Sequence, residues 1–188
     1  MAKQFPALSD EHAAFIARQH IFFAASATAD SRINLSPREA SAFRVLGPNS
    51  ACYLDQTGSG AETAAHLLVD GRLTIMFCSF EKVPLILRLY GTARSLMRGT
   101  PDYAAVLQTG FDGAESPGAR QIVLLEVALV QTSCGYGVPF FDFVSERQQL
   151  KTWAAGQGDG GMAEYRARKN TVSLDGLPTG FGTTPTAE

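Results

Sequence analysis

The segment Thr57-Gly58-Ser59-Gly60 has the residue types best suited to a chemical task. Glycines let backbone N–H groups turn toward an anion, and the hydroxyl side chains add hydrogen-bond donors. Good helix formers follow over 62–69, so the positive end of a helix dipole would face the same anion. The pattern predicts a phosphate-binding loop. It lacks the Lys of a P-loop and the third Gly of the dinucleotide fingerprint, and a plain Gly/Ser turn explains the four residues alone equally well.

The cysteines and histidines form no pattern for metal binding or nucleophilic catalysis. Cys52, Cys78 and Cys134 are odd in number, far apart and each in an apolar, strand-like run, which favours reduced thiols with a packing role. The three histidines lack the spacing of zinc ligands. His66, in the helical run 62–69, is interpreted as a surface or hydrogen-bonded histidine rather than a catalytic base. No metal site is predicted.

Composition limits the class of protein. The chain has 188 residues, 45% apolar and 18% charged, where soluble domains average about 25% charged. With 16 Lys and Arg against 18 Asp and Glu, nothing favours nucleic acid or an anionic membrane as a partner. No secretory signal and no run of about 20 apolar residues is found, so a cytoplasmic location is expected. We expect one domain over 1–178 and a flexible tail over 179–188.

Turn and cap signals divide the chain into short elements. Ser9 is placed to cap a first helix, and Gly71 to end the second one. Gly91 inside a long strand indicates a bulge or a barrel bend. Strands are predicted at 21–27, 32–35, 43–46, 51–54, 72–80, 85–96 and 121–132, and helices at 9–17, 62–69, 101–111, 145–155 and 161–169. Strands that do not alternate regularly with helices predict an α+β fold, a mostly antiparallel barrel with helices at its ends.

Several motifs in this order carry a resemblance. They are RINLSP (32–37), FRVLGPNSACYLD (43–55), TGSGAETAAHL (57–67), MFCSFE (76–81), ILRLYGTAR (86–94), QTSCGYGVP (131–139) and KNTVSLDGLP (169–178). From about residue 20 to 178 the chain resembles the pyridoxamine 5'-phosphate oxidase-related family of FMN-binding split barrels. The resemblance implies a six-stranded antiparallel split β-barrel with peripheral helices, a homodimer, and FMN bound between the two subunits.

The resemblance also implies cofactor-binding residues. They are Asn34, Leu35 and Ser36 along the flavin ring, Thr57, Gly58, Ser59 and Thr63 at the phosphate, Phe77, Cys78 and Ser79 on a strand beside the ring, and Arg88 as a phosphate partner. Oxidases of this family carry a basic Ser-Arg-Lys run where this chain has Ala61-Glu62-Thr63. Arg44, Lys82 or Arg88 would then have to supply the charge that a phosphate requires. The C-terminal Arg- and Trp-bearing motif that grips the oxidase substrate is also missing, so pyridoxamine phosphate oxidation itself is not expected.

The predicted function follows from this set. No Ser/His/Asp or paired-carboxylate arrangement emerges, so the chemistry is assigned to the cofactor, in an FMN-dependent oxidoreductase with a small-molecule electron donor or acceptor. Two alternatives stay open: a non-catalytic flavin or tetrapyrrole binding and sensing module, and a deazaflavin-dependent reductase. Tyr136 either stacks near the flavin of the partner subunit or closes a turn. Trp153 is predicted to pack its helix with Leu150.

Overall fold

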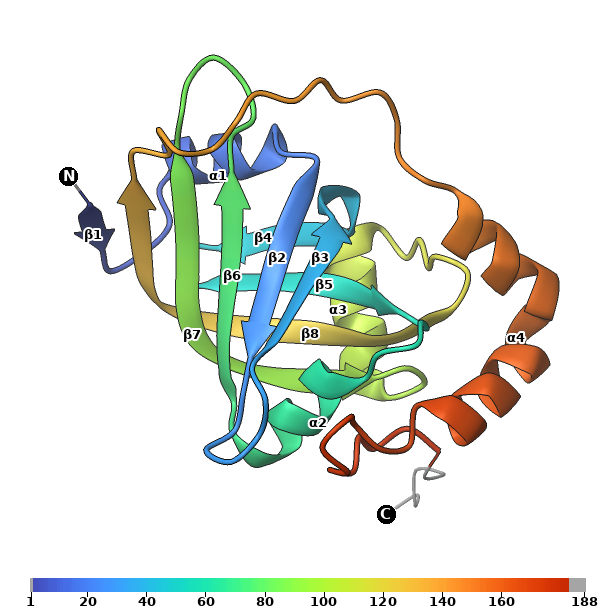
Figure 1. Cartoon of the computed structure of the whole chain (residues 1–188). Helices are drawn as coiled ribbons and strands as arrows, with labels where there is room; N and C mark the ends of the chain where they lie inside the picture. Colours follow the sequence, from blue (N-terminus) through green and yellow to red (C-terminus); the bar gives the residue numbers. More distant parts are fainter. Residues whose placement is uncertain (1, 183–188) are drawn as a thin grey trace.

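The computed structural model describes residues 2–182 and consists of a strongly curled antiparallel sheet with helices around it (Figure 1). The strands are β1 (Lys3–Phe5), β2 (Ile21–Ser26), β3 (Asn34–Glu39), β4 (Phe43–Gly47), β5 (Ser50–Gln56), β6 (Arg72–Cys78), β7 (Ile86–Met97) and β8 (Ala119–Ser133). The helices are α1 (Asp10–Ala17), the 3-10 turn η1 (Ala40–Ala42), α2 (Glu62–Val69), α3 (Pro101–Phe111) and α4 (Gln149–Lys169). The predicted α+β split-barrel class is confirmed.

The strand order is β3-β2-β6-β7-β8-β5-β4, with β1 paired to the end of β8. The described chain therefore has eight strands, and the expected number of six is wrong. The additional pairing follows from the length of β8. β5 pairs with β8 only as far as Glu126, so the same edge of β8 has no partner from β5 beyond that residue. The short strand β1 pairs with residues 130–132 instead. A strand of three residues gives too short a pattern to be predicted from the sequence.

Gly91 causes the bend of β7. The register of β7 against β8 shifts between Tyr90 and Gly91, which is the predicted bulge. A Cβ at Gly91 would lie 1.9 Å from the carbonyl oxygen of Glu126, so only glycine fits. Gly71 acts differently from the expectation. Its φ is not left-handed, and a Cβ there would lie 2.7 Å from Thr92 Cγ2, so it provides close packing against β7 rather than a helix cap.

The helix ends follow local capping signals. Ser9 caps α1 by accepting the N–H of His12, and Thr100 caps α3 with Pro101 in the first turn. The two helices predicted near the C-terminus form α4, which is interrupted at Gly158 with φ +65°. The first of them begins at Gln149 instead of Ser145, because residues 134–148 form an extended linker that leads from β8 across the molecule to α4 (Figure 1).

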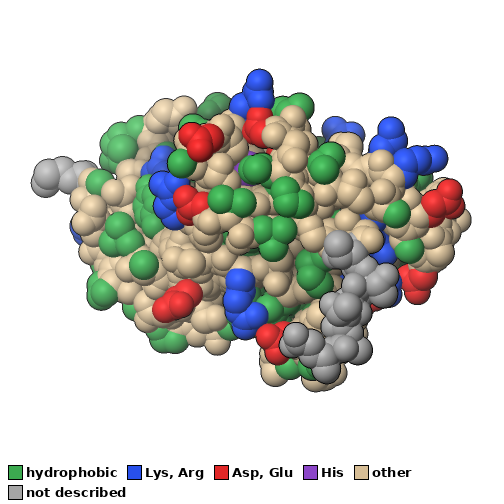
Figure 2. All heavy atoms as spheres, turned by 90° about the horizontal axis from the view of Figure 1, so that it is seen from below, with side chains coloured by type: hydrophobic (Ala, Val, Ile, Leu, Met, Phe, Trp, Pro, Cys, Tyr) green, Lys and Arg blue, Asp and Glu red, His purple; other side chains and the backbone are tan. Residues whose placement is uncertain are grey.

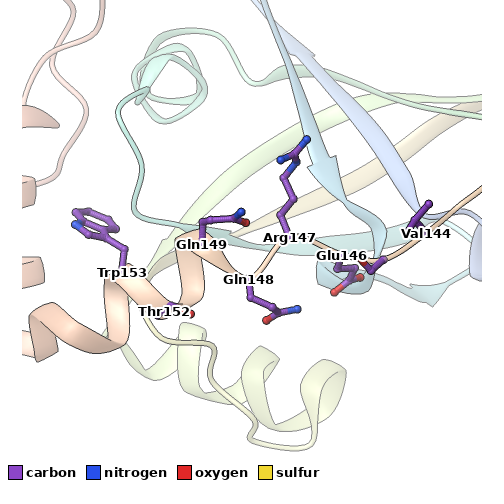
Figure 3. Close-up of a pocket in the computed structure, with 8 residues that line it drawn as sticks. Val144, Glu146, Arg147, Gln148, Gln149, Thr152 and Trp153 are labelled. Carbon is purple, nitrogen blue, oxygen red and sulfur yellow. The ribbon is translucent and has the colours of Figure 1, made fainter.

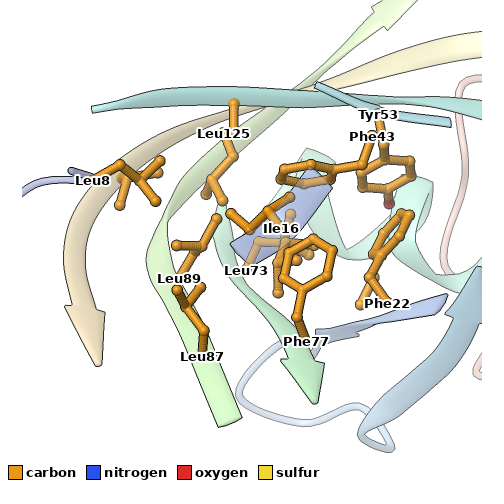
Figure 4. Packing of buried hydrophobic residues seen from close by; sticks show 14 of the residues in the cluster. Leu8, Ile16, Phe22, Phe43, Tyr53, Leu73, Phe77, Leu87, Leu89 and Leu125 are labelled. Atoms are coloured by element: carbon orange, nitrogen blue, oxygen red, sulfur yellow. The ribbon is translucent and has the colours of Figure 1, made fainter. Parts of the chain in front are cut away.

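The core fills the inside of the curled sheet (Figure 4). Aromatic rings meet at its centre, with Phe22 contacting Phe43, Tyr53 and Phe77 at centroid distances of 5.3, 5.4 and 5.7 Å. Leucines such as Leu87 and Leu89 of β7 complete it, and both are fully buried. A smaller apolar cluster holds α3 against β5 and β8. The barrel is therefore a packed core, and any ligand must bind at its ends or on its outer face.

The C-terminal tail packs on the barrel through Gly182. Thr179 and Phe181 are only 1% and 5% exposed, and Phe181 contacts Ala61 and Ala64 of the α2 region. Residues 179–182, the first part of the predicted tail, are thus packed against the barrel through a buried hydroxyl and an apolar ring. Residues 183–188 lie outside the described residues.

Residues 2–182 contain neither a membrane-spanning helix nor a cluster of metal-binding side chains. No helix there is both long and apolar enough to cross a membrane, and no group of three His, Cys, Asp or Glu side chains is placed to hold a metal ion.

Candidate cofactor site

The predicted ring and phosphate residues of β3 and α2 contact each other directly. The side-chain amide of Asn34 donates to Thr63 Oγ1 over 3.0 Å, and Ser36 Oγ donates to Asn34 Oδ1 over 3.0 Å. Asn34 and Ser36 point to the same side of β3 because residues alternate along a strand. The hydrogen bonds join the first residues of β3 to the first turn of α2 and orient their polar side chains.

Backbone groups of the loop between β5 and α2 form hydrogen bonds to residues from other parts of the chain. Thr57 is fully buried and donates its N–H to the carbonyl of Gly118 over 2.7 Å. The carbonyl of Gly58 accepts from Asn170 Nδ2 over 2.9 Å, and the carbonyl of Gly60 accepts from Arg120 over 2.8 Å. Because the N–H of a trans peptide points opposite to its C=O, the N–H groups of the next residues in this loop face away from these partners.

The N-terminus of α2 has no side-chain cap. The N-cap residue is Ala61, whose methyl group cannot accept a hydrogen bond, so the first N–H groups of the helix lack a side-chain partner. Ser59 is exposed at the tip of the loop, and Thr63 lies in the first helical turn. An oxyanion is the group that this set of backbone amides and hydroxyls fits. Glu62 lies beside them, since a Cβ on Gly60 would meet its carboxylate at 2.7 Å.

A buried ionic network supports the loop from inside the barrel. Asp55, at the end of β5, accepts from Arg120 Nε over 2.8 Å and from Gln121 Nε2 over 2.7 Å, and it also pairs with Arg38 of β3. Burial alone would raise the pKa of Asp55, but the charges of Arg120 and Arg38 outweigh it and lower this pKa to about 2. Asp55 therefore stays ionised and holds two arginines next to the loop.

The cations near the loop are not the expected ones. Arg44 instead donates to the carbonyl of Gly110, Lys82 is exposed between β6 and β7, and Arg88 donates to Ser133 on β8. The residues that the structure places beside the loop are Arg38, Arg120 and Arg166. Two of them are occupied by Asp55, whereas Arg166 of α4 donates to Thr57 Oγ1 over 3.1 Å.

The other predicted residues lie apart from this set. Phe77 is fully buried in the core, so its side chain is not available to a ligand. Cys78 points to the opposite face of β6, and burial raises the pKa of its thiol despite the nearby charge of Arg88. Ser79 follows the strand and accepts the N–H of Glu81.

Strand register places Arg88 on the outer face of the sheet. Arg88 pairs with Met76, Met76 with Phe23, and Phe23 with Pro37. Paired residues of antiparallel strands share a face, so Arg88 and Asn34 are on opposite faces of the sheet. Leu35 shares the outer face with Arg88 and is 61% exposed. The single chain thus presents two separate groups of predicted residues.

Residues 170–179 contact the predicted site, a role that the sequence did not predict. Asn170 is fully buried and bridges the Gly58 carbonyl and Arg120, while Thr179 donates to the Asn170 carbonyl. Farther along, the Asp175 carboxylate accepts the backbone N–H of Arg32 over 2.9 Å, just before β3. The motif KNTVSLDGLP thereby forms hydrogen bonds to both the loop after β5 and the segment just before β3.

The three cysteines and His66 differ in their burial. Cys52 and Cys78 are buried, but Cys134 is exposed directly after β8, so the packing role is wrong for Cys134. His66 is fully buried, so the surface alternative is wrong; its Nδ1 lies 3.0 Å from Ser26 Oγ, whereas its Nε2 has no hydrogen-bond partner among the described residues. Trp153 packs edge-on against Tyr165 at 5.0 Å within α4.

One cleft of the molecule lies away from the predicted site residues. This cleft of about 770 Å³ is lined by residues 144–149 of the linker and the start of α4, with Thr152 and Trp153 (Figure 3). It contains none of the predicted site residues. On the face turned toward the viewer in Figure 2, Lys and Arg side chains are spread among Asp and Glu rather than joined in one basic patch. The predicted site residues thus lie outside this cleft.

Comparison with known proteins decides the family. Residues 8–134 match the sequence profile described as pyridoxamine 5'-phosphate oxidase. The chain belongs to the pyridoxamine 5'-phosphate oxidase family. A family member named ustO from Aspergillus flavus is 38% identical over 191 residues, covering 93% of this chain and 76% of the relative.

Solved structures agree on the fold of this family member. HupZ of Group A Streptococcus aligns with a TM-score of 0.52 and 20% identity, covering 64% of this chain and 89% of HupZ. A Lactobacillus delbrueckii protein named as a candidate pyridoxamine 5'-phosphate oxidase aligns with a TM-score of 0.53 and 18% identity, covering 67% and 94%. At these identities the likeness shows a shared fold alone.

Proposed function

We propose that this member of the pyridoxamine 5'-phosphate oxidase family is an FMN-binding oxidoreductase. The observation that carries the proposal is the arrangement at one end of the barrel. The Thr57 to Gly60 loop, the uncapped N-terminus of α2 and Arg166 meet there, next to Asn34 of β3. A phosphate monoester with a charge near −2 is bound best by backbone amides, hydroxyls and a guanidinium together.

The residues of the chain have separate tasks in this proposal. Thr63 and Ser59 donate to the phosphate, and the α2 dipole favours its negative charge. Asn34, fixed by Thr63 and Ser36, directs the start of β3 toward the polar edge of the ring. When bound, FMN supplies the hydride or electron chemistry, and the protein supplies position and electrostatics.

The flavin ring would lie between two copies of the chain. The outer face of β3, β2 and β6 supports this, because it carries the half-buried Phe23 and Met76 beside Leu35. The linker adds exposed Phe140 and Phe141, at 76% and 65%. Exposed apolar side chains in such number are typical of an interface. Sedimentation equilibrium should therefore show a dimer, and a monomer at micromolar concentration would contradict this part of the proposal.

Replacing Ser59 and Thr63 together by Ala should weaken FMN binding by about 1–3 kcal/mol, since two hydroxyl donors to the phosphate are removed. Fluorescence titration of the flavin measures this change. The control is Ser41→Ala with Thr109→Ala, which removes the same two types of hydroxyl from exposed positions in η1 and α3. If the double variant and the wild type bind FMN with equal affinity, the phosphate does not bind at this loop.

The alternatives predict different responses to an electron donor. A bound flavin that NAD(P)H bleaches and oxygen restores is expected for an oxidoreductase. Bound flavin that stays oxidised with every donor would instead favour a binding or sensing module, and preference for a deazaflavin over FMN would favour the reductase alternative.

A further inference from the structure

Arg166 is unusual among the arginines around the loop. It lies on α4, more than a hundred residues after Thr57, yet its NH1 donates to the Thr57 hydroxyl over 3.1 Å. This contact takes only one of the five N–H donors of a guanidinium. No ion pair of Arg166 is found among residues 2–182, although the side chain is half-buried.

The neighbouring cations form ion pairs with carboxylates, whereas Arg166 forms none among residues 2–182. Arg120 is paired with Asp55, and Arg98 is paired with Glu115 and Asp159. Burial lowers the pKa of Arg166, the like charges of Arg98 and Arg120 lower it further, and the carboxylates of Asp159 and Glu115 offset part of this effect. A half-buried guanidinium without an ion-pair partner gains free energy when an anion binds to it.

We propose that Arg166 contacts the phosphate group of the cofactor and replaces the basic residues that the Ala61-Glu62-Thr63 segment lacks. This inference rests on the proposed FMN binding. The contact with Thr57 places the guanidinium at the beginning of the phosphate loop, and its planar fork suits the oxygens of a phosphate monoester. Because α4 belongs to the same chain, the C-terminal region contributes a ligand to the site as well as packing.

The test compares two ligands that differ only in the phosphate. FMN and riboflavin are titrated against the wild type, Arg166→Gln and Arg166→Lys. Arg166→Gln should weaken FMN binding about tenfold or more, the loss expected for a charge-assisted hydrogen bond, while riboflavin binding changes less than about twofold. Arg166→Lys keeps the charge and should restore part of the FMN affinity. If Arg166→Gln fails to fold, the ratio of FMN affinity to riboflavin affinity is compared between Arg166→Lys and the wild type, and this ratio should be lower in the variant.

Arg168→Gln is the matched control. Arg168 is exposed on the same helix, about 200° around its axis from Arg166, and the substitution changes the net charge equally. It should leave both affinities unchanged. An equal loss for FMN and riboflavin in Arg166→Gln, or no loss for either, would overturn the assignment.

A second probe separates this inference from the proposed function. Inorganic phosphate, compared with chloride at equal ionic strength, should raise the melting temperature of the wild type but not of Arg166→Gln. If the wild type binds no FMN yet shows this difference, the proposed function fails and the anion site at Arg166 stands. If phosphate stabilises both proteins equally, or neither, the anion site is wrong.

Discussion

Replacing Asp55 by Asn should reduce the free energy of unfolding by about 3–5 kcal/mol, the usual cost of leaving buried charges without their partner. Asp55 is fully buried and is the carboxylate that both Arg38 and Arg120 contact. The amide keeps the shape but loses the charge. Urea denaturation at pH 7 measures the difference.

The carboxylate of Asp55 also makes the free energy of unfolding depend on pH under acidic conditions. The folded-state pKa of Asp55 is lowered from 3.8 to about 2, so its contribution to stability is present above pH 3.8 and is lost as the pH falls toward 2. The wild type should lose about 2 kcal/mol over that range through this residue, and Asp55→Asn should not.

Asp159→Asn is the control. The Asp159 side chain, which pairs with Arg98, is 84% exposed. Losing this ion pair should therefore reduce the free energy of unfolding by less than about 1 kcal/mol. An Asp55 variant as stable as this control would show that the network does not support the barrel.

Substituting Gly91 by Ala should destabilise the protein by about 3 kcal/mol or more, at the upper end of overpacking effects. The new Cβ would lie 1.9 Å from the backbone oxygen of Glu126, so β7 and β8 must separate at the bulge that closes the barrel. Thermal unfolding followed by circular dichroism gives the change. Gly47→Ala is the matched strand variant, since nothing lies within 4 Å of its added methyl group. If the two variants melt at the same temperature, the bulge tolerates a side chain and this explanation of the bend is wrong.

Most elements of the fold were predictable because their signals are local. The bounds of α3 follow from Thr100 and Pro101 at its start, and the bulge at Gly91 follows from a glycine within a long apolar strand. Strand β1 was not predictable, because its pairing depends on the edge that β5 leaves open on β8. The burial of Phe181 depends in the same way on α2, which is distant in sequence.

The candidate site was predictable only in part. The loop and its hydroxyl residues stand together in the sequence, and the resemblance added Asn34. The burial of Phe77 could not be predicted because MFCSF is apolar on both strand faces, so no alternation indicates which face is buried. Arg120, Arg166 and Asn170 were missed because they reach the loop only through tertiary contacts. The one local signal was an acidic residue, Asp55, at the end of an apolar strand.

The central claim is that this barrel end binds FMN, and titration of the flavin-free protein with FMN under a visible spectrum tests it most directly. The account predicts a saturable shift of the flavin absorption at micromolar concentration, one FMN per chain, and weaker binding of riboflavin. A colourless protein whose addition leaves the FMN spectrum unchanged would contradict it.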